Sequence, residues 1–307
     1  MRHLARVGVG VAVLVLTVGC SHAASPGQRT PASRPVVVAS FNFPESVLLG
    51  EIYAEALEHA GVPVRRELDL GTREMVLPAV HQGLVDVVPE YQGSLLAALD
   101  PGSSLQGASS GTERSALIAD LRAWHVELLD AAPAQDQNGL VVTKALAARL
   151  GLRATSDLIP VAPRLTLGAP AECPTRPFCL VGLEHTYGLH FARFEPFDAE
   201  SQRVAALQQQ VVDVALMFTT DGELATGDFV VLDDDRHLQP ADNVVPIVST
   251  RAITTFGPAV AAALDAVSSA LTQQDIVFLN WRVSVAGKAV PSEARGWLQR
   301  HHLVPAG

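Results

Sequence analysis

Residues 79–87 read AVHQGLVDV and residues 206–214 read ALQQQVVDV, two similar segments that lie far apart in this 307-residue chain. Each is typical of a helix end, a turn and a buried strand. Five positions past its aspartate, each copy carries an aromatic residue, Tyr91 in the first and Phe218 in the second. The echo predicts two lobes built alike, with both rings at corresponding strand ends, where α/β folds gather ligands. The alternative is chance similarity between two helix-to-strand junctions.

Short apolar runs alternate with helical patterns from residue 35 onward, which is typical of an α/β fold. Strands are expected at residues 36–39, 64–70, 85–88, 140–143, 165–169, 211–216 and 244–249. Helices are expected at residues 44–60, 72–82, 94–99, 113–131, 258–271, 274–285 and 292–301. Pro44 suits the first turn of its helix, and Gly61 ends that helix. The hydrophobic fraction of 48% indicates a globular chain with a substantial core.

Residues 172–179, ECPTRPFC, hold the two cysteines that lie beyond the N-terminal region. Cys173 and Cys179 are expected to form a disulfide. This bond closes a small ring, so it would fix local shape more than it raises global stability. Arg176 lies midway between the cysteines, and a guanidinium suits a carboxylate that it can hold by two parallel hydrogen bonds. The alternative is a stapled surface turn whose arginine binds nothing.

The N-terminus is typical of an exported protein. Arg2 and Arg6 precede an uncharged apolar run at residues 7–18, which is too short to span a bilayer and indicates a signal peptide at residues 1–19. Loss of that segment removes both arginines and changes the formal charge from −10 to −12. The net negative charge and the lack of a basic cluster argue against nucleic acid as a partner.

Residues 17–20, TVGC, resemble a bacterial lipobox, in which Cys20 would be lipidated. Residues 20–35 are rich in Ser, Ala, Pro and Gly, which suits a flexible tether between a lipid and a folded domain. These features predict an extracytoplasmic protein anchored by lipid to the outer face of the cell membrane. The alternative is cleavage after residue 23, which would release the protein without an anchor.

Eight short segments, in order along the chain, resemble the substrate-binding component of ABC importers for glycine betaine, choline, proline and related osmoprotectants, as an actinobacterial-type lipoprotein. They are residues 40–45 (SFNFPE), 50–54 (GEIYA), 70–74 (LGTRE), 85–93 (VDVVPEYQG), 175–177 (TRP), 187–189 (YGL), 218–222 (FTTDG) and 231–235 (VLDDD). The resemblance implies a two-lobed periplasmic-binding-protein fold of the second type, with the ligand cleft between the lobes. Lobe one would comprise residues 36–135 and 241–307, and lobe two residues 136–240. A ligand that touches both lobes would favour the closed state.

The resemblance also implies how a ligand is held. A quaternary ammonium has no hydrogen to donate, so the family holds it by cation–π attraction inside a cage of aromatic faces. Tyr91 and Phe218 fall on cage positions, and Arg176 falls on the arginine that binds the ligand's carboxylate. Ser94 stands where a threonine hydroxyl often assists that carboxylate.

The sequence departs from the family pattern at three positions. Gly139 and Ala241 fall where members with full cages carry tyrosines, and Phe41 falls where a lysine often assists the carboxylate. The cage is therefore expected to be incomplete unless Phe41 or Phe43 supplies another ring. The alternative is a widened pocket that holds a bulkier aromatic or polyol compound.

Further residues are expected to line the cleft because they stand at helix starts or at the hinge. They are Asn42 and Phe43 before the first helix, Thr72 before the second, Asn138 in a polar run at residues 135–138, and Thr219 after Phe218. The alternative for each is helix capping or an exposed linker.

The chain is expected to be a monomer that needs no cofactor and delivers a small molecule to an ABC permease. Its ten histidines show no paired spacing typical of a metal site, so no metal is expected. No His-Glu-x-x-His motif is present, which argues against a metallohydrolase. A scaffold or adhesin lipoprotein without a working cleft is a further alternative.

Overall fold

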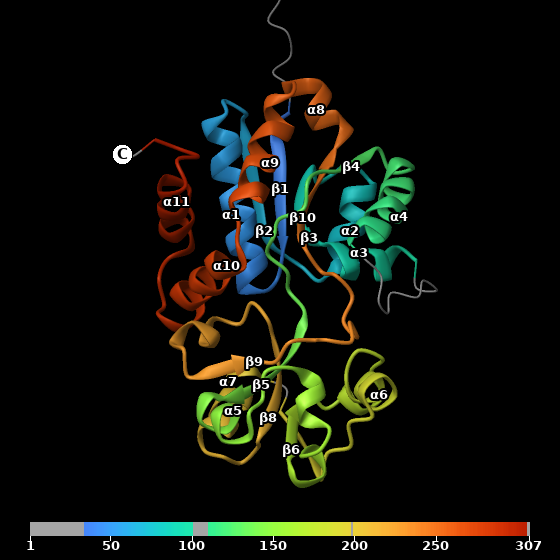
Figure 1. Ribbon diagram of the computed structural model, residues 1–307. Helices are drawn as coiled ribbons and strands as arrows, with labels where there is room; N and C mark the ends of the chain where they lie inside the picture. Colours follow the sequence, from blue (N-terminus) through green and yellow to red (C-terminus); the bar gives the residue numbers. More distant parts are fainter. Residues whose placement is uncertain (1–33, 101–109, 198, 306–307) are drawn as a thin grey trace, which may run out of the picture. The chain divides into compact units, whose positions relative to one another are not determined.

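The computed structural model describes residues 34–100, 110–197 and 199–305. The predicted signal peptide at residues 1–19, the lipidation at Cys20 and nearly all of the tether at residues 20–35 lie outside the described residues. In the described part, the chain forms two five-stranded mixed sheets (Figure 1). We use lobe one for the first sheet with the helices packed on it, and lobe two for the second.

Lobe one has the strand order β2-β1-β3-β10-β4, in which β1 pairs parallel with β2 and β3, and β10 is antiparallel to β3 and β4. Its strands are β1 (Val36–Phe41), β2 (Val64–Gly71), β3 (Val87–Tyr91), β4 (Val126–Leu128) and β10 (Val244–Ser249). Its helices are α1 (Pro44–His59), α2 (Arg73–His81), α3 (Gln92–Leu99), α4 (Ser110–Arg122), α8 (Thr250–Phe256), α9 (Ala259–Ala270), α10 (Gln273–Asn280) and α11 (Val290–Arg300), with a π-helical turn (Trp281–Val285) after α10. Every residue of β1 is buried, because helices cover both faces of the sheet (Figure 1).

Lobe two has the strand order β7-β6-β8-β5-β9, in which β6 pairs parallel with β7 and β8, and β5 is antiparallel to β8 and β9. Its strands are β5 (Asn138–Thr143), β6 (Thr166–Ala169), β7 (Arg193–Pro196), β8 (Val214–Phe218) and β9 (Phe229–Val231). Its helices are α5 (Lys144–Leu150), α6 (Leu180–Gly182) and α7 (Glu200–Gln208), with short helical turns at Thr155–Leu158, Ala162–Arg164, Cys173–Thr175, Leu183–Tyr187 and Gly222–Thr226.

Two crossing segments connect the sheets: residues 129–137 lead from β4 to β5, and residues 232–243 return from β9 to β10. They run beside each other, since Gln135 and Asn243 form an antiparallel bridge. The backbone N–H of Asp136 also donates to the carbonyl of Asp242 at 3.0 Å. Residues on these segments are therefore close to both sheets.

The sequence echo is confirmed as a repeated backbone junction. Asp86 precedes β3, donates its N–H to the carbonyl of Val37 at 2.9 Å and accepts the N–H of Val37 on Oδ2 at 3.0 Å. Asp213 precedes β8, donates to the carbonyl of Thr166 at 3.0 Å and accepts the N–H of Thr166 on Oδ2 at 2.9 Å. Each aspartate thus ties its strand to the neighbouring parallel strand.

The expected helix at residues 113–131 is wrong in its second half. The helix ends at Arg122, and the chain then turns through His125, whose φ of 56° lies in the left-handed region and cannot continue a helix. β4 follows and pairs with β10. The expected helix at residues 274–285 is also divided, since the α-helix ends at Asn280 and continues as a π-helical turn.

Among the described residues, no single helix is long and apolar enough to cross a membrane. In the part of the chain that the structure describes, α8 and α9 are the one pair that together reach that length and composition, and they meet at a bend of 117°. Val260, Leu264 and Val267 of α9 are fully buried in the core of lobe one.

Candidate ligand-binding site

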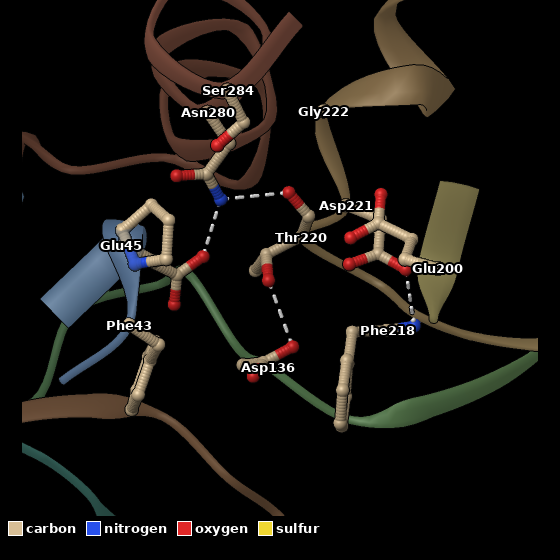
Figure 2. Close-up of a pocket in the computed structure, with 11 residues that line it drawn as sticks. Phe43, Glu45, Asp136, Glu200, Phe218, Thr220, Asp221, Gly222, Asn280 and Ser284 are labelled. Carbon is tan, nitrogen blue, oxygen red and sulfur yellow. Dashed lines mark hydrogen bonds between the residues drawn. The ribbon is translucent and has the colours of Figure 1, made fainter. Parts of the chain in front are cut away.

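A cavity of about 400 Å³ is lined by residues from both lobes (Figure 2). Its aromatic faces are Phe43, which precedes α1, and Phe218, which ends β8; these side chains are 37% and 47% exposed. Its polar walls are Glu45, Asp136, Glu200, Thr220, Asp221, Asn280 and Ser284. No lysine or arginine occurs among the described residues that line this cavity. The cavity therefore combines exposed rings with an excess of carboxyl groups.

Glu45 is held in the first turn of α1 by donors from two other elements. The Tyr91 hydroxyl donates to Oε1 at 2.5 Å, and the Asn280 amide donates both to Oε2 and to the carbonyl of Thr220, the latter at 2.8 Å. Burial raises the pKa of Glu45, and the hydrogen bonds from Tyr91 and Asn280 oppose this rise. This network fixes the carboxyl group at the cavity wall.

Asp136 lies on the first crossing segment and accepts the Thr220 hydroxyl on Oδ1 at 2.8 Å. Burial raises the pKa of Asp136 well above its usual range, and the nearby Glu45 carboxyl raises it further. Ionisation of both acidic groups in one cavity is unfavourable without a compensating charge. A cation in the cavity would supply that charge.

Asp221 and Glu200 form the lobe-two wall of the cavity. Asp221 accepts the backbone N–H of Phe218 on Oδ2 at 2.9 Å, which fixes the backbone that carries the exposed ring. Burial raises the pKa of Asp221 to about 7 despite that hydrogen bond. Burial and the acidic neighbours Glu223 and Asp221 raise the pKa of Glu200 to about 10. Part of this wall is therefore protonated at neutral pH when no ligand is bound.

A second cavity of about 180 Å³ shares Asp136 and Phe218 with the first and extends toward α3 and the disulfide loop. Ser94 lines it and donates its hydroxyl to Asp242 Oδ2 at 2.6 Å, while its N–H donates to Oδ1 at 2.9 Å. Burial raises the pKa of Asp242 to about 6. The two cavities are therefore neighbours, with Asp136 and Phe218 in the lining of both.

Four residues singled out in the sequence line these two cavities. Phe43 borders the larger one, Ser94 and Asn138 border the smaller one, and Phe218 borders both. Tyr91 lies behind them: it is 4% exposed, and its ring centroid is 6.1 Å from that of Phe43. Tyr91 therefore borders neither cavity and contacts Glu45 and Phe43, which border the larger one.

Other predicted site residues lie outside both cavity linings. Asn42 and Thr72 are exposed at the starts of α1 and α2, and the Thr72 side chain makes no capping hydrogen bond. The Thr219 hydroxyl accepts the N–H of Gln137 at 2.9 Å and donates to the carbonyl of Gln135 at 3.0 Å, so it holds the first crossing segment. The threonine that borders the larger cavity is the next residue along, Thr220.

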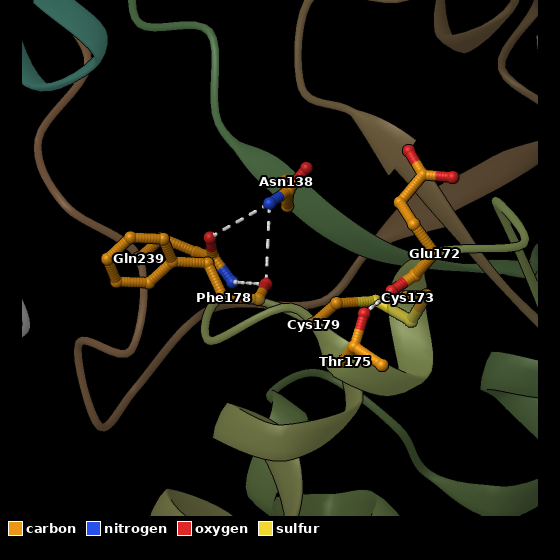
Figure 3. Close-up of a disulfide and its surroundings, with 7 residues drawn as sticks. All are labelled: Asn138, Glu172, Cys173, Thr175, Phe178, Cys179 and Gln239. Carbon is orange, nitrogen blue, oxygen red and sulfur yellow. Dashed lines mark hydrogen bonds between the residues drawn. A yellow bond between two sulfur atoms is a disulfide. The ribbon is translucent and has the colours of Figure 1, made fainter. Parts of the chain in front are cut away.

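The predicted disulfide between Cys173 and Cys179 is confirmed, with the two Cα atoms 5.2 Å apart (Figure 3). Arg176, between the cysteines, is exposed and borders neither cavity. Phe178 of the same loop is half-buried and does border the smaller one.

Gly139 does not leave a gap in the aromatic wall. In the pairing of β5 with β8, Asn138 lies opposite Phe218, and Gly139 lies opposite the buried Met217. Alternate residues of a strand face opposite sides of the sheet, so Gly139 faces away from Phe218. A Cβ atom at this glycine would lie 2.9 Å from Cγ1 of Val231. The interpretation of Gly139 as an empty cage position is therefore wrong.

Sequence analysis missed the carboxyl groups of the cavity. Glu45 and Asp221 stand inside segments that carry the family resemblance, and Asp136 stands in the polar run at the hinge, so a signal was present for these three. The carboxyl group of Glu200 and the amide of Asn280, which binds Glu45, lie on helices with no such signal. Only folding brings these two residues to the cavity. These acids do not converge as metal ligands, since no group of three or more such side chains among the described residues is placed to hold a metal ion.

Comparisons with known proteins agree with this geometry. Residues 34–300 match the family model described as the substrate-binding domain of an ABC-type glycine betaine transport system. The chain is 27% identical over 282 residues to the glycine betaine-binding protein YehZ of Escherichia coli strain K12, across 88% of this chain and 91% of that protein. The structure of apo YehZ matches with a TM-score of 0.78 at 26% identity, covering 89% of this chain and 100% of that chain.

Two further similarities differ in what they cover. The ergothioneine transport permease/ergothioneine binding protein EgtU of Helicobacter pylori strain G27 is 24% identical over 268 residues, which are 87% of this chain but only 48% of that protein. A crystal structure titled as a glycine betaine/carnitine/choline ABC transporter matches with a TM-score of 0.82 at 20% identity, over 87% of this chain and 99% of that chain. These matches confirm the predicted two-lobed periplasmic-binding-protein fold. The chain therefore belongs to the family of substrate-binding domains of ABC-type glycine betaine transport systems.

Proposed function

We propose that this protein binds a quaternary amine, such as choline or glycine betaine, outside the cytoplasm and delivers it to an ABC permease. The observation that carries the proposal is the larger cavity, where Phe43 and Phe218 border a wall that contains the buried Glu45 and the half-buried Asp136. A methylated ammonium is attracted to aromatic faces and to negative charge, and it needs no hydrogen-bond acceptor. Both kinds of attraction are available in this cavity.

The acidic walls also indicate where each end of a ligand would lie. The ammonium group would sit between the two rings, where it compensates Glu45 and Asp136. The carboxylate of a zwitterion such as glycine betaine would be repelled by the same groups. We assign this carboxylate to Arg176, the positively charged residue of the disulfide loop, because the family resemblance places a carboxylate-binding arginine at this position.

The other residues are assigned from their positions. Ser94 and Asn138 would contact the ligand from the smaller cavity, Tyr91 would orient Glu45, and Thr219 would hold the hinge. Asn42 and Thr72 would approach the ligand from the helix starts when the lobes close. The hinge would divide the chain into residues 36–135 with 241–307 and residues 136–240. We further propose that the protein acts as a monomer anchored through lipid on Cys20.

Titration calorimetry with choline and glycine betaine tests this assignment. The unaltered protein should bind both ligands. Arg176→Ala should weaken glycine betaine binding about tenfold or more, because a charge-assisted pair is lost, and should leave choline binding unchanged. Arg164→Ala, which removes an exposed arginine elsewhere in lobe two, is the matched control.

The outcomes separate the two parts of the proposal. If Arg176→Ala weakens both ligands equally or neither, Arg176 is not the carboxylate partner. If the unaltered protein binds no quaternary amine, the proposed function itself is wrong.

A further inference from the structure

Phe178 occupies an unusual position on the disulfide loop. Its ring packs against the hydrophobic core of lobe one and also against that of lobe two. Of the described residues, it is the only partly buried hydrophobic side chain that packs against both. It also borders the smaller cavity together with Phe218. A ligand in that cavity would therefore meet an aromatic side chain that contacts both lobes.

The backbone carbonyl of Phe178 is held by two side chains that lie next to the hinge, on the lobe-two side (Figure 3). Its carbonyl accepts the side-chain amide of Asn138, at the start of β5, at 3.3 Å. The same carbonyl accepts the side-chain amide of Gln239, on the second crossing segment, at 3.0 Å. Asn138 also donates to Oε1 of Gln239 at 3.3 Å, so the three residues form a closed network.

The disulfide restrains the other side of this residue. Cys179 directly follows Phe178, and both cysteines are buried in the core of lobe two, 1% and 3% exposed. Within the loop, the N–H of Cys179 donates to the carbonyl of Arg176 at 3.1 Å. Phe178 is thus restrained by the covalent ring that the disulfide closes and by two side-chain hydrogen bonds to its carbonyl.

We propose that Phe178 is a third aromatic face of the ligand site, beside Phe43 and Phe218, and that the disulfide loop holds it in place. The inference rests on the proposed quaternary-amine function. The proposal also gives the disulfide a role in ligand affinity. A disulfide that closes so short a loop adds little to global stability, so its main effect would be on local shape.

Phe178→Leu is the direct test, because leucine keeps an apolar side chain and removes the π face. Choline affinity should fall about tenfold, the range expected for one desolvated cation–π contact. Affinity for dimethylbutanol, the uncharged carbon analogue of choline, should stay unchanged. Phe191→Leu is the matched control, since Phe191 is a half-buried phenylalanine that packs on the lobe-two core and borders neither cavity.

A second variant tests whether the contribution of the Phe178 ring depends on the disulfide. Cys173→Ala with Cys179→Ala should weaken choline binding by a similar factor, and adding Phe178→Leu to that variant should cause little further loss. Circular dichroism and urea denaturation would confirm that each variant is folded.

Each outcome has a defined meaning. Equal losses for choline and dimethylbutanol would show that Phe178 only packs, and unchanged choline affinity would place Phe178 outside the site. If the losses of choline affinity are fully additive, the ring and the disulfide affect binding independently, and the disulfide does not act by holding Phe178. If the unaltered protein binds neither choline nor tetramethylammonium, the proposed function fails, whatever Phe178 does.

Discussion

The junctions before β3 and β8 have the same backbone hydrogen-bond arrangement, but the aromatic side chains at the ends of these strands lie in different environments. Asp86 and Asp213 make the same two hydrogen bonds to a neighbouring strand. Five residues later, Tyr91 is 4% exposed, whereas Phe218 is 47% exposed. The scaffold is thus repeated in both lobes, and the ring at its end has a different role in each.

The environment of each ring accounts for this difference. The hydroxyl of Tyr91 has a buried partner, Glu45, at 2.5 Å, so the ring is retained inside lobe one. Phe218 has no hydroxyl, and its backbone N–H is held by Asp221 at the cavity edge, so its ring remains available to a ligand. The sequence echo therefore predicts the positions of the rings but not their exposure.

The largest expected effect concerns the two aspartates. Asp86 is 2% exposed and additionally accepts Nη2 of Arg251 at 2.6 Å and the hydroxyl of Ser249 at 2.6 Å. Asp86→Ala should lower the free energy of unfolding by about 3–5 kcal/mol, because Arg251 loses its charge partner. Asp213→Ala should cost about 1–3 kcal/mol, because it leaves the backbone N–H of Thr166 without its acceptor. Urea denaturation measures both, and equal losses would contradict the argument.

The next comparison alters the ring at the end of each junction. Tyr91→Phe removes a donor from buried Glu45 and should cost about 1–3 kcal/mol of stability. Phe218→Ala should change stability by about 0.5 kcal/mol or less, since the side chain is half exposed, yet lower choline affinity about tenfold. Denaturation and calorimetry on both variants check this. A stability loss for Phe218→Ala as large as that for Tyr91→Phe would show that the rings do not differ in role.

The acidic cavity predicts a dependence on pH. Asp221, with a pKa of about 7, faces Glu200, Glu223 and Arg203. A carboxyl group whose pKa is higher in the folded than in the unfolded protein stabilises the fold below the unfolded value, and this stability is lost as pH rises through the folded value. The unliganded protein should therefore become less stable between about pH 4 and pH 7.

Cation binding should show the opposite trend. Choline favours the ionised carboxyl groups, so its affinity should fall on the order of tenfold from pH 7.5 to pH 5.5, with protons released on binding. Calorimetry in buffers of different ionisation enthalpy measures that release. Proton uptake, or an affinity independent of pH, would argue against a role for these carboxyl groups.

The smallest effect concerns the turn in each junction. Gly83 and Gln210 occupy equivalent positions with φ of 68° and 59°, in the left-handed region. Glycine adopts this conformation without strain, so Gln210→Gly should stabilise the protein and Gly83→Gln should destabilise it, each by about 1 kcal/mol. Thermal denaturation of both variants tests this symmetry. Changes of the same sign would show that the turns are not equivalent.

Sequence patterns predicted the elements with long, unbroken periodicity. β1 and β10 are fully buried strands, and α1 begins at the proline expected to start it. β4 and β9 have three residues each, too few to show a period, and pairing with longer strands defines them. The left-handed turn at His125 could not be read from composition.

The same limit applies to the site. The place of Phe218 at the cavity followed from the family resemblance, and that of Phe43 followed from its position at the start of the first helix. Asn280 reaches Glu45 across 235 positions of sequence, and Phe178 meets Asn138 and Gln239 across 40 and 61. Such contacts depend on tertiary packing, which one sequence does not encode in any local pattern.

Binding of tetramethylammonium, the isolated head group, tests the central claim most directly. Calorimetry should detect binding to the unaltered protein at pH 7.5, and the Phe43→Ala with Phe218→Ala variant should lose it while staying folded. Failure of the unaltered protein to bind this ion, or equal binding by the variant, would contradict a quaternary-amine site between these two rings.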